Sequence, residues 1–251
     1  MKRQPVAIPC QDIRLRGEIT LPDGEGPLPA VVICHPHPLH GGDMDNNVVM
    51  GVNDALLRRG IATLRFNFRG AGGSEGVHDN GVGEVDDALA ALRLLATSDG
   101  VDASRLGLAG YSFGAGVALR AALGSSLCPL PVGEGEGEGE TSLKRKVAPT
   151  LARGFAVRAV AAIGCPPRAL AALDGAPSLP KLFVAGERDH IAASAQLRPL
   201  VARLPQPADL VAVPRADHFF VGHESIVGDH VADFFAAWLG NKNAQRNHEH
   251  G

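Results

Sequence analysis

A serine between two glycines, in Gly110-Tyr-Ser112-Phe-Gly114, has the surroundings that best fit a nucleophile. The apolar stretch 105–109 leads directly into it, and 113–123 continues as a helix rich in small residues. A strand–turn–helix of this kind projects a serine hydroxyl above a sheet, and the flanking glycines leave room for the sharp turn. The N-terminus of the helix also favours developing negative charge. The pattern therefore predicts attack by Ser112 on a carbonyl carbon.

The same five-residue pattern occurs a second time, at Gly72-Gly-Ser74-Glu-Gly76. Because the chain has 31 glycines in 251 residues, the pattern alone is a weak signal. Ser74 lies several residues beyond the nearest expected strand, 61–68, and glycine-rich loop sequence follows it. It has neither a strand directly before it nor a helix directly after it, so the sequence favours Ser112 over Ser74.

A serine hydroxyl is a poor nucleophile unless a histidine takes its proton and an acid orients that histidine. His218 is the expected base, because it follows the apolar stretch 209–213 and precedes the last helix. That position lies at the carboxyl edge of a parallel sheet, where the nucleophile turn also lies. His223, near the start of the helix, is the close rival. His230 falls within the apolar stripe of that helix, and we expect it to be structural.

The acid is expected at the end of a strand that lies between the serine and the histidine in the chain. The stretch 181–185 is followed by Glu187 and Asp189. We prefer Asp189, because the loop needs a few residues to turn over the sheet edge. Glu187 is expected to pair with a neighbour such as Arg188 on the surface. The preceding stretch, 156–163, has no carboxylate near its end.

Two backbone N–H groups must hold the oxygen that becomes charged in such a reaction. Phe113, directly after the serine, is the first predicted donor. The second is expected from the loop after the apolar stretch 30–34, which reads His35-Pro-His37-Pro-Leu-His40. Proline has no N–H, so we expect His37 to donate. Metal binding by these three histidines is the alternative, although no carboxylate follows at the usual ligand spacing. The serine reaction itself requires no cofactor.

Apolar stretches and helical segments alternate along the chain after an N-terminal antiparallel hairpin at 6–21. The expected strands are 30–34, 61–68, 105–109, 156–163, 181–185 and 209–213. The expected helices are 44–59, 84–96, 113–123, 193–204 and 226–239, with Pro199 arguing against an unbroken fourth helix. This alternation predicts an α/β protein with a mostly parallel, doubly wound sheet and helices on both faces.

One domain is expected over 1–240, because a chain of this length usually builds a single α/β core. The segment 128–153 contains a Gly-Glu repeat and is predicted to be a mobile surface insertion at the sheet edge opposite the nucleophile. The polar segment 241–251 is predicted to be a tail.

The composition argues against several classes of partner. With a net charge of −3 and no long run of Lys or Arg, the chain lacks the basic surface of a nucleic-acid-binding protein. No apolar stretch reaches the roughly 18 residues of a membrane span, and no secretory signal is indicated. The 4 cysteines lack CxxC spacing, which favours reduced thiols in a cytoplasmic protein. The composition leaves the oligomeric state open.

Several of these motifs together resemble a known family. They are His-Pro-His-Pro-Leu-His-Gly-Gly at 35–42, Asn-Phe-Arg-Gly at 67–70, the serine motif at 110–114, and Asp189 with His218. This combination resembles a small, lidless serine hydrolase or esterase branch of the α/β-hydrolase superfamily, distantly like dienelactone hydrolases. The resemblance spans residues 6–240 and implies an α/β-hydrolase fold without a cap domain. Lid domains in this superfamily usually enter after the strand that here ends near residue 163, and only 164–180 precede the next strand, so the resemblance also implies a shallow, open substrate pocket. Dienelactone hydrolases use a cysteine nucleophile, so Ser112 argues against a lactone substrate.

The residues and the resemblance together imply a serine hydrolase that cleaves a small-molecule carboxylic ester or thioester through an acyl-enzyme. Residues expected to line its pocket are Leu39, Tyr111, Ile191 and Phe219. Two other functions use the same features. One is an acyltransferase with the same three catalytic residues, and the other is a non-catalytic binding protein that keeps the hydrolase fold. The acyl chain and the leaving group stay open at this point.

Overall fold

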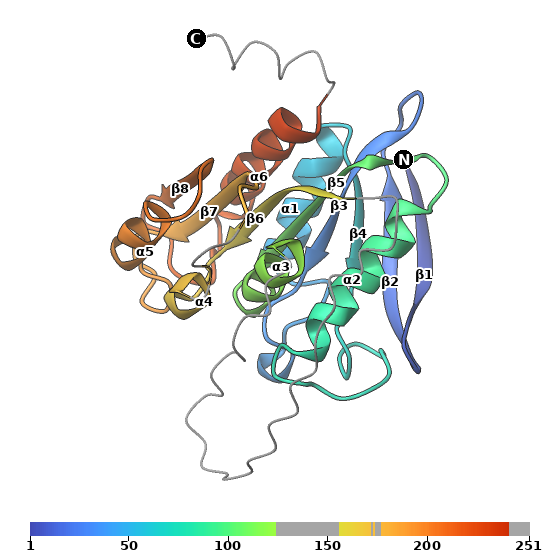
Figure 1. The fold of residues 1–251 in the computed structure, drawn as a ribbon, viewed down its shortest axis with the longest axis horizontal. Coiled ribbons are helices and arrows are strands. Elements are labelled where there is room, and N and C mark those ends of the chain that lie inside the picture. Colours follow the sequence, from blue (N-terminus) through green and yellow to red (C-terminus); the bar gives the residue numbers. More distant parts are fainter. Residues whose placement is uncertain (124–155, 172, 174–176, 241–251) are drawn as a thin grey trace.

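The computed structural model describes residues 1–123, 156–171, 173 and 177–240. These residues build one eight-stranded sheet in the order β1-β2-β4-β3-β5-β6-β7-β8 (Figure 1). The predicted insertion at 128–153 and the predicted tail at 241–251 lie outside the described residues. Among the helices that the structure describes, none is long and apolar enough to cross a membrane.

The sheet is antiparallel at one edge and parallel elsewhere, which confirms the predicted mostly parallel α/β sheet. β1 (Lys2–Cys10) and β2 (Ile13–Leu21) form the N-terminal hairpin, and β2 also pairs antiparallel with β4 (Ala62–Phe66). The other strands run parallel to β4 and are β3 (Leu28–Cys34), β5 (Val101–Tyr111), β6 (Val157–Ile163), β7 (Lys181–Gly186) and β8 (Ala208–Val213).

Helices cover both faces of the sheet. One face carries α1 (Asn47–Arg58) and α6 (Glu224–Leu239). The other carries α2 (Gly83–Ala96), α3 (Phe113–Leu123), the short α4 (Pro167–Ala171) and α5 (Ser194–Val201), which contains Pro199 (Figure 1).

The central strand β3 shows why both faces must be covered. Its residues Ala30, Val32 and Cys34 pack with α2 and α3, whereas Val31 and Ile33 pack with α1 and α6. All five side chains are buried. A strand buried on both faces has an uninterrupted apolar run instead of an alternating one, which is the pattern of this segment.

Helix α6 packs through every fourth residue, at Val227, Val231, Phe235 and Leu239. The prediction that His230 lies on this stripe is wrong, because His230 is exposed. A spacing of four residues exceeds the 3.6 residues of a helical turn, so the stripe drifts toward Gly228 and Ala232 and leaves His230 facing solvent.

The parallel strands end at one common edge, and the loops that leave this edge carry the predicted site. The loop after β3 contains His37, the turn after β5 contains Ser112, the loop after β7 contains Asp189, and the loop after β8 contains His218. In open α/β sheets, ligands bind at this carboxyl edge. Segments far apart in the sequence thus meet where chemistry is expected.

Candidate active site

Ser112 occupies the turn between β5 and α3. Its φ angle is 53°, in the left-handed region that residues with a side chain seldom adopt. Its N–H donates to the Ile163 carbonyl oxygen at 2.8 Å, and its own carbonyl oxygen accepts from the Ala115 N–H at 3.1 Å. Strained backbone of this kind persists only where the surrounding structure holds it, and such residues cluster at functional sites.

Two glycines allow the turn to be this tight. A side chain at Gly110 would bring its Cβ to 2.1 Å from the Gly114 carbonyl oxygen. A side chain at Gly114 would bring its Cβ to 2.4 Å from the carbonyl oxygens of both Cys34 and His35. Helix α3 therefore begins directly against the end of β3, which places Phe113 beside the loop that contains His37.

We expect Gly114→Ala to destabilise the protein by about 2–3 kcal/mol, because the new methyl group can be accommodated only if α3 moves away from β3. Urea unfolding measures this change. A matched control is Gly24→Ala, whose Cβ would meet only the flexible end of the Leu28 side chain, at 3.3 Å. That variant should stay within about 0.5 kcal/mol of the parent protein. Equal unfolding free energies for the two variants would contradict this account of the turn.

His218 lies between Ser112 and Asp189. Its Nε2 is 3.0 Å from Ser112 Oγ, and its Nδ1 is 2.8 Å from Asp189 Oδ2. His218 is 7% exposed and Asp189 is 2% exposed, so the contacts are shielded from water. When Asp189 is ionised, Nδ1–H donates to the carboxylate and Nε2 is left to accept the serine proton. The structure thus brings together the three residues predicted as nucleophile, base and acid.

The second oxygen of the Asp189 carboxylate is held by backbone N–H groups. This oxygen, Oδ1, accepts from the N–H groups of Ile191, at 2.8 Å, and Ala192, at 2.7 Å. Burial by itself raises the pKa of Asp189, but the hydrogen bonds from His218, Ala192 and Ile191 outweigh it, so the pKa lies below its usual value. The carboxylate is therefore ionised at neutral pH and directed at His218.

The rival acid and the rival base have other partners. Glu187 Oε2 accepts from the Arg215 N–H at 3.0 Å, which ties it to the loop that carries His218. This contact replaces the predicted surface pairing of Glu187 with Arg188. His223 stands directly before α6, where its Nδ1 lies 3.1 Å from the Val221 carbonyl oxygen. Neither rival reaches Ser112 through a contact in the described part of the chain.

Ser74, in the second Gly-x-Ser-x-Gly copy, has a structural environment. Its hydroxyl donates to the Asn67 carbonyl oxygen at 2.7 Å and accepts from the Arg16 N–H at 2.9 Å. The first contact lies within the loop after β4, and the second ties this loop to strand β2. The hydroxyl of Ser74 is thus used to close its own loop.

His35 stiffens the loop after β3. It is fully buried, its Nδ1 lies 2.6 Å from the Pro36 carbonyl oxygen, and its Nε2 accepts from the Phe68 N–H at 3.0 Å. Burial lowers its pKa to about 4, so the ring is neutral with its proton on Nδ1. Both ring nitrogens are engaged with backbone. Within the described residues, no group of three or more His, Cys, Asp or Glu side chains is arranged to hold a metal ion.

The rest of this loop is fastened to β4 and to the residue that follows it. The Met44 N–H donates to Asn67 Oδ1 at 2.8 Å, and Arg65 Nη1 donates to the Met44 carbonyl oxygen at 2.8 Å. The His37 ring packs 4.8 Å from the Phe113 ring, measured between centroids. In the part of the chain that the structure describes, no group accepts from the backbone N–H of His37 or of Phe113. These are the two predicted oxyanion donors.

The four predicted pocket residues divide into two groups. Leu39, Ile191 and Phe219 are exposed on three different loops of the carboxyl edge. Tyr111 is instead buried, and its hydroxyl donates to the His218 carbonyl oxygen at 2.7 Å. The position of Tyr111 next to the nucleophile suggested substrate contact, whereas its hydrogen bond supports the loop that carries the histidine.

Sequence reasoning overlooked Gly164, which follows β6. Its φ angle is 54°, and a Cβ there would lie 3.2 Å from His218 Cε1 and 3.3 Å from a Tyr111 ring carbon. The glycine therefore lets the histidine ring sit against the end of β6. A glycine directly after an apolar strand was the available signal, because such glycines mark close approach of another group.

A family model and a relative in sequence each match part of the chain. The family model described as X-Pro dipeptidyl-peptidase (S15 family) matches residues 11–126. An uncharacterized protein of Rickettsia prowazekii is 48% identical over 92 residues, which span 37% of this chain and only 38% of that protein.

Solved structures match over nearly the whole chain. An alpha-beta serine hydrolase homologue from Coxiella burnetii is 30% identical with a TM-score of 0.73, covering 93% of this chain and 97% of that one. A serine hydrolase without lid from Xanthomonas campestris is 25% identical with a TM-score of 0.75, covering 96% and 97%. The chain therefore belongs to the serine hydrolases of the α/β-hydrolase superfamily.

Proposed function

We propose that this protein hydrolyses a carboxylic ester or thioester of a small molecule with a catalytic triad of Ser112, His218 and Asp189. One observation carries the proposal. Ser112, in its strained turn, is joined to Asp189 through the two nitrogens of His218, at 3.0 Å and 2.8 Å. A serine, a histidine and a carboxylate in this arrangement form the constellation that activates a hydroxyl for attack on an acyl carbon.

The geometry supports a two-step reaction. His218 Nε2 takes the proton as Ser112 Oγ attacks the carbonyl carbon, while Asp189 stabilises the resulting imidazolium. The backbone N–H groups of Phe113 and His37 hold the oxygen that becomes negative. The protonated His218 then gives its proton to the leaving oxygen or sulfur, which leaves an acyl-Ser112. A water molecule, deprotonated by His218, hydrolyses this intermediate and restores the enzyme.

The distribution of exposed apolar side chains supports a substrate with an apolar part. Among the described residues, most large exposed apolar side chains lie in the four loops that follow β3, β4, β7 and β8, namely Leu39, Val77, Val82, Ile191, Phe219 and Val221. All four loops leave the sheet edge that carries Ser112. Each methylene group removed from water contributes about 0.8 kcal/mol to binding, so a longer acyl chain that contacts these side chains gains affinity.

Phe219→Ala tests this assignment, because the Phe219 ring centroid lies 6.0 Å from that of His218. We expect kcat/KM for a p-nitrophenyl hexanoate to fall about fivefold, which corresponds to the loss of roughly one methylene contact. Hydrolysis of the acetate should change by less than about twofold, because its acyl chain is too short to reach the ring. The control is Ile226→Ala, which removes an exposed apolar side chain of α6. An equal loss of kcat/KM for both esters would show that Phe219 does not select esters by the length of their acyl chain.

A second candidate function is cleavage of a peptide bond, because residues 11–126 match the X-Pro dipeptidyl-peptidase model. The same triad chemistry cleaves amides and esters, so only the rates on an amide substrate and an ester substrate can decide between the two functions. Comparing a Gly-Pro p-nitroanilide with p-nitrophenyl butyrate measures this directly. We expect hydrolysis of the ester and at most a trace of anilide cleavage.

Labelling with a fluorophosphonate, followed by mapping of the adduct, tests the proposed function as a whole. We expect one adduct on Ser112, together with turnover of p-nitrophenyl esters or an acyl thioester. Absence of both would favour the non-catalytic binding protein. An adduct on Ser74 would overturn the choice of nucleophile. Transfer of the acyl group to an added alcohol, in preference to water, would establish the acyltransferase.

A further inference from the structure

A third aromatic ring packs against the two residues that supply the oxyanion N–H groups. The centroid of the His78 ring lies 4.8 Å from that of His37 and 5.4 Å from that of Phe113. Since the His37 and Phe113 rings are themselves 4.8 Å apart, the three rings contact one another pairwise. His78 belongs to the loop between β4 and α2, a segment with no part in the triad.

The His37 ring acts in this cluster as an uncharged surface. Burial first, and then the neighbouring His78, His40 and Arg168, together lower its pKa to about 4. At neutral pH the contact between His37 and His78 is therefore one of ring packing. Pro36 and Pro38 flank His37, so its backbone has little freedom to move independently of its side chain.

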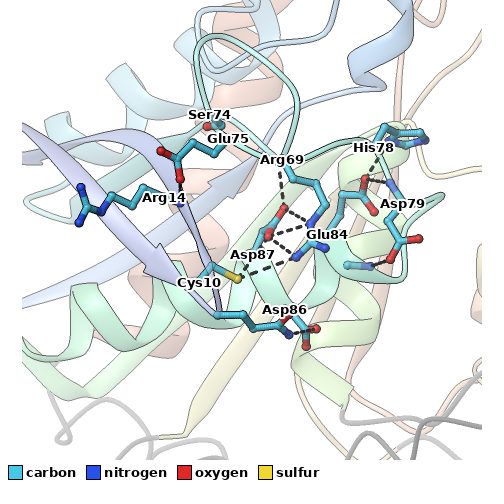
Figure 2. A network of polar contacts seen from close by, with 12 residues as sticks. Cys10, Arg14, Arg69, Ser74, Glu75, His78, Asp79, Glu84, Asp86 and Asp87 are labelled. Carbon is cyan, nitrogen blue, oxygen red and sulfur yellow. Dashed lines mark hydrogen bonds and ion pairs between the residues drawn. The ribbon is translucent and has the colours of Figure 1, made fainter.

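The position of His78 is set by a buried carboxylate. His78 Nδ1 lies 2.8 Å from Glu84 Oε1, close enough for an ion pair although without the alignment of a hydrogen bond. Glu84 is fully buried at the start of α2, where the helix N-terminus favours negative charge. Figure 2 shows the His78 ring at the end of this network, next to Glu84 and Asp79.

The same carboxylate shapes the backbone around His78. Glu84 Oε1 accepts from the Asp79 N–H at 2.8 Å, and Oε2 accepts from the Gly81 N–H at 2.7 Å. Asp79 Oδ2 in turn accepts from the Gly83 N–H at 3.0 Å (Figure 2). Helix α3, which begins beside the nucleophile, is tied to this loop by Arg120 Nη1, which donates to the Gly81 carbonyl oxygen at 2.9 Å.

The other end of the β4–α2 loop is fixed by an ion pair. This ion pair lies next to a residue that contacts the loop after β3, which contains His35 and His37 and is called the oxyanion loop below. Arg69 donates to both carboxylate oxygens of the buried Asp87 of α2, with Nη2 at 2.7 Å from Oδ1 and Nε at 3.1 Å from each oxygen (Figure 2). The residue before Arg69 is Phe68, whose N–H holds His35. The β4–α2 loop therefore reaches the oxyanion loop twice, through Phe68 with His35 and through His78 with His37.

We propose that His78 is a positioning residue for the oxyanion hole. Its ring, held by Glu84, keeps the His37 and Phe113 rings together and so keeps their backbone N–H groups directed at the same oxygen. This inference rests on the proposed function, in which those two N–H groups hold the oxyanion. His78 itself touches neither the triad nor, by this account, the substrate.

His78→Ala removes the ring and should lower kcat roughly tenfold, less than the 10² to 10³ that complete loss of an oxyanion donor costs. KM should stay within about twofold, because the donors act on the charge that develops in the transition state. The second-order rate of Ser112 phosphonylation by a fluorophosphonate should fall by a similar factor, since that reaction also places negative charge on an oxygen. His78→Phe keeps a ring for the contacts with His37 and Phe113 but loses the one with Glu84, so it should recover both rates only in part, to within about threefold of wild type.

His40→Ala is the matched control. The His40 ring also lies near His37, at 4.7 Å, but it is exposed and has no contact with Phe113 among the described residues. Its loss should change kcat by less than about twofold, because the His37–Phe113 contact is untouched. Circular dichroism melting of each variant, with assays well below the lowest melting temperature, separates a slow enzyme from an unfolded one.

An unchanged kcat and an unchanged phosphonylation rate in folded His78→Ala would overturn the positioning role. A loss confined to KM would overturn it too, and so would a failure of folded His78→Phe to recover activity. The labelling rate separates this inference from the proposed function. If wild-type Ser112 is phosphonylated but no ester is turned over, the substrate proposal fails while the effect of His78 on labelling still decides the inference.

Discussion

Ser112→Ala is expected to lower kcat for an activated ester by about 10⁴-fold or more and to abolish labelling by a fluorophosphonate. The alanine has no oxygen to attack the carbonyl carbon, while the oxyanion donors and the rest of the fold stay in place. Stability should change little or even rise, because alanine removes only one hydroxyl from a part-buried site. Ester hydrolysis under saturating substrate and mass spectrometry of the adduct measure the two effects.

Ser74→Ala is the control for that experiment, because Ser74 lies in the same five-residue pattern. Its hydroxyl contacts the Asn67 carbonyl oxygen and the Arg16 N–H, so its removal leaves two backbone groups without a partner. We expect a loss of about 1–3 kcal/mol in the free energy of unfolding, with kcat within about threefold of wild type. If Ser74→Ala instead abolished labelling in a folded protein, the assignment of the nucleophile would be wrong.

Asp189→Asn has the second-largest expected effect, about 10⁴-fold in kcat, as is typical when the acid of a triad becomes an amide. The backbone N–H groups of Ile191 and Ala192 require an oxygen at the Oδ1 position, so the amide NH₂ must face His218. His218 Nδ1 then has to accept a hydrogen bond, and the ring proton moves to Nε2. In this tautomer the imidazole cannot take the proton of Ser112.

The matched control is Glu187→Gln in the same loop. A glutamine oxygen can still accept from the Arg215 N–H, so the loop that carries His218 stays in place. We expect kcat within about fivefold of wild type, because only a charge near the site is removed. A larger loss for Glu187→Gln than for Asp189→Asn, in variants with equal melting temperatures, would identify Glu187 as the acid.

The supporting contacts differ in kind from the triad. Ser112, His218 and Asp189 are joined by direct contacts between their side chains. The proposed oxyanion donors are backbone groups, so their position depends on how two loops and the start of α3 pack together. Side chains that hold this packing, such as His35 and His78, act through the residues that they contact. They do not contact the substrate oxygen that becomes negative in the proposed reaction. This is why a remote ring is expected to affect kcat while leaving KM unchanged.

The location of the three residues of the proposed triad was predictable from local patterns. Uninterrupted apolar runs such as 30–34 and 182–185 mark strands buried on both faces, and such strands run parallel in an α/β sheet. Parallel strands end at the same edge, so residues that directly follow different strands meet there whatever the strand order is. For Ser112, Asp189 and His218, a position after a strand was therefore enough to predict that they come together.

Other features were decided only by tertiary contacts. The sequence pattern put His230 on the buried stripe of α6 and Tyr111 in the pocket, but the drift of the stripe exposes His230 and the carbonyl of His218 takes up the Tyr111 hydroxyl. Glu187 likewise binds a backbone N–H 28 residues away in place of its neighbour.

The amino-acid sequence by itself determined the α/β alternation, the nucleophile turn and the sheet edge at which the acid and the histidine lie, because each follows from periodicity and chain order. Only the tertiary structure decided how the loops brace one another, as in the contact of His78 with His37 and Phe113. Contacts between loops have no repeating spacing, since each depends on the shapes of two segments that are distant in the chain.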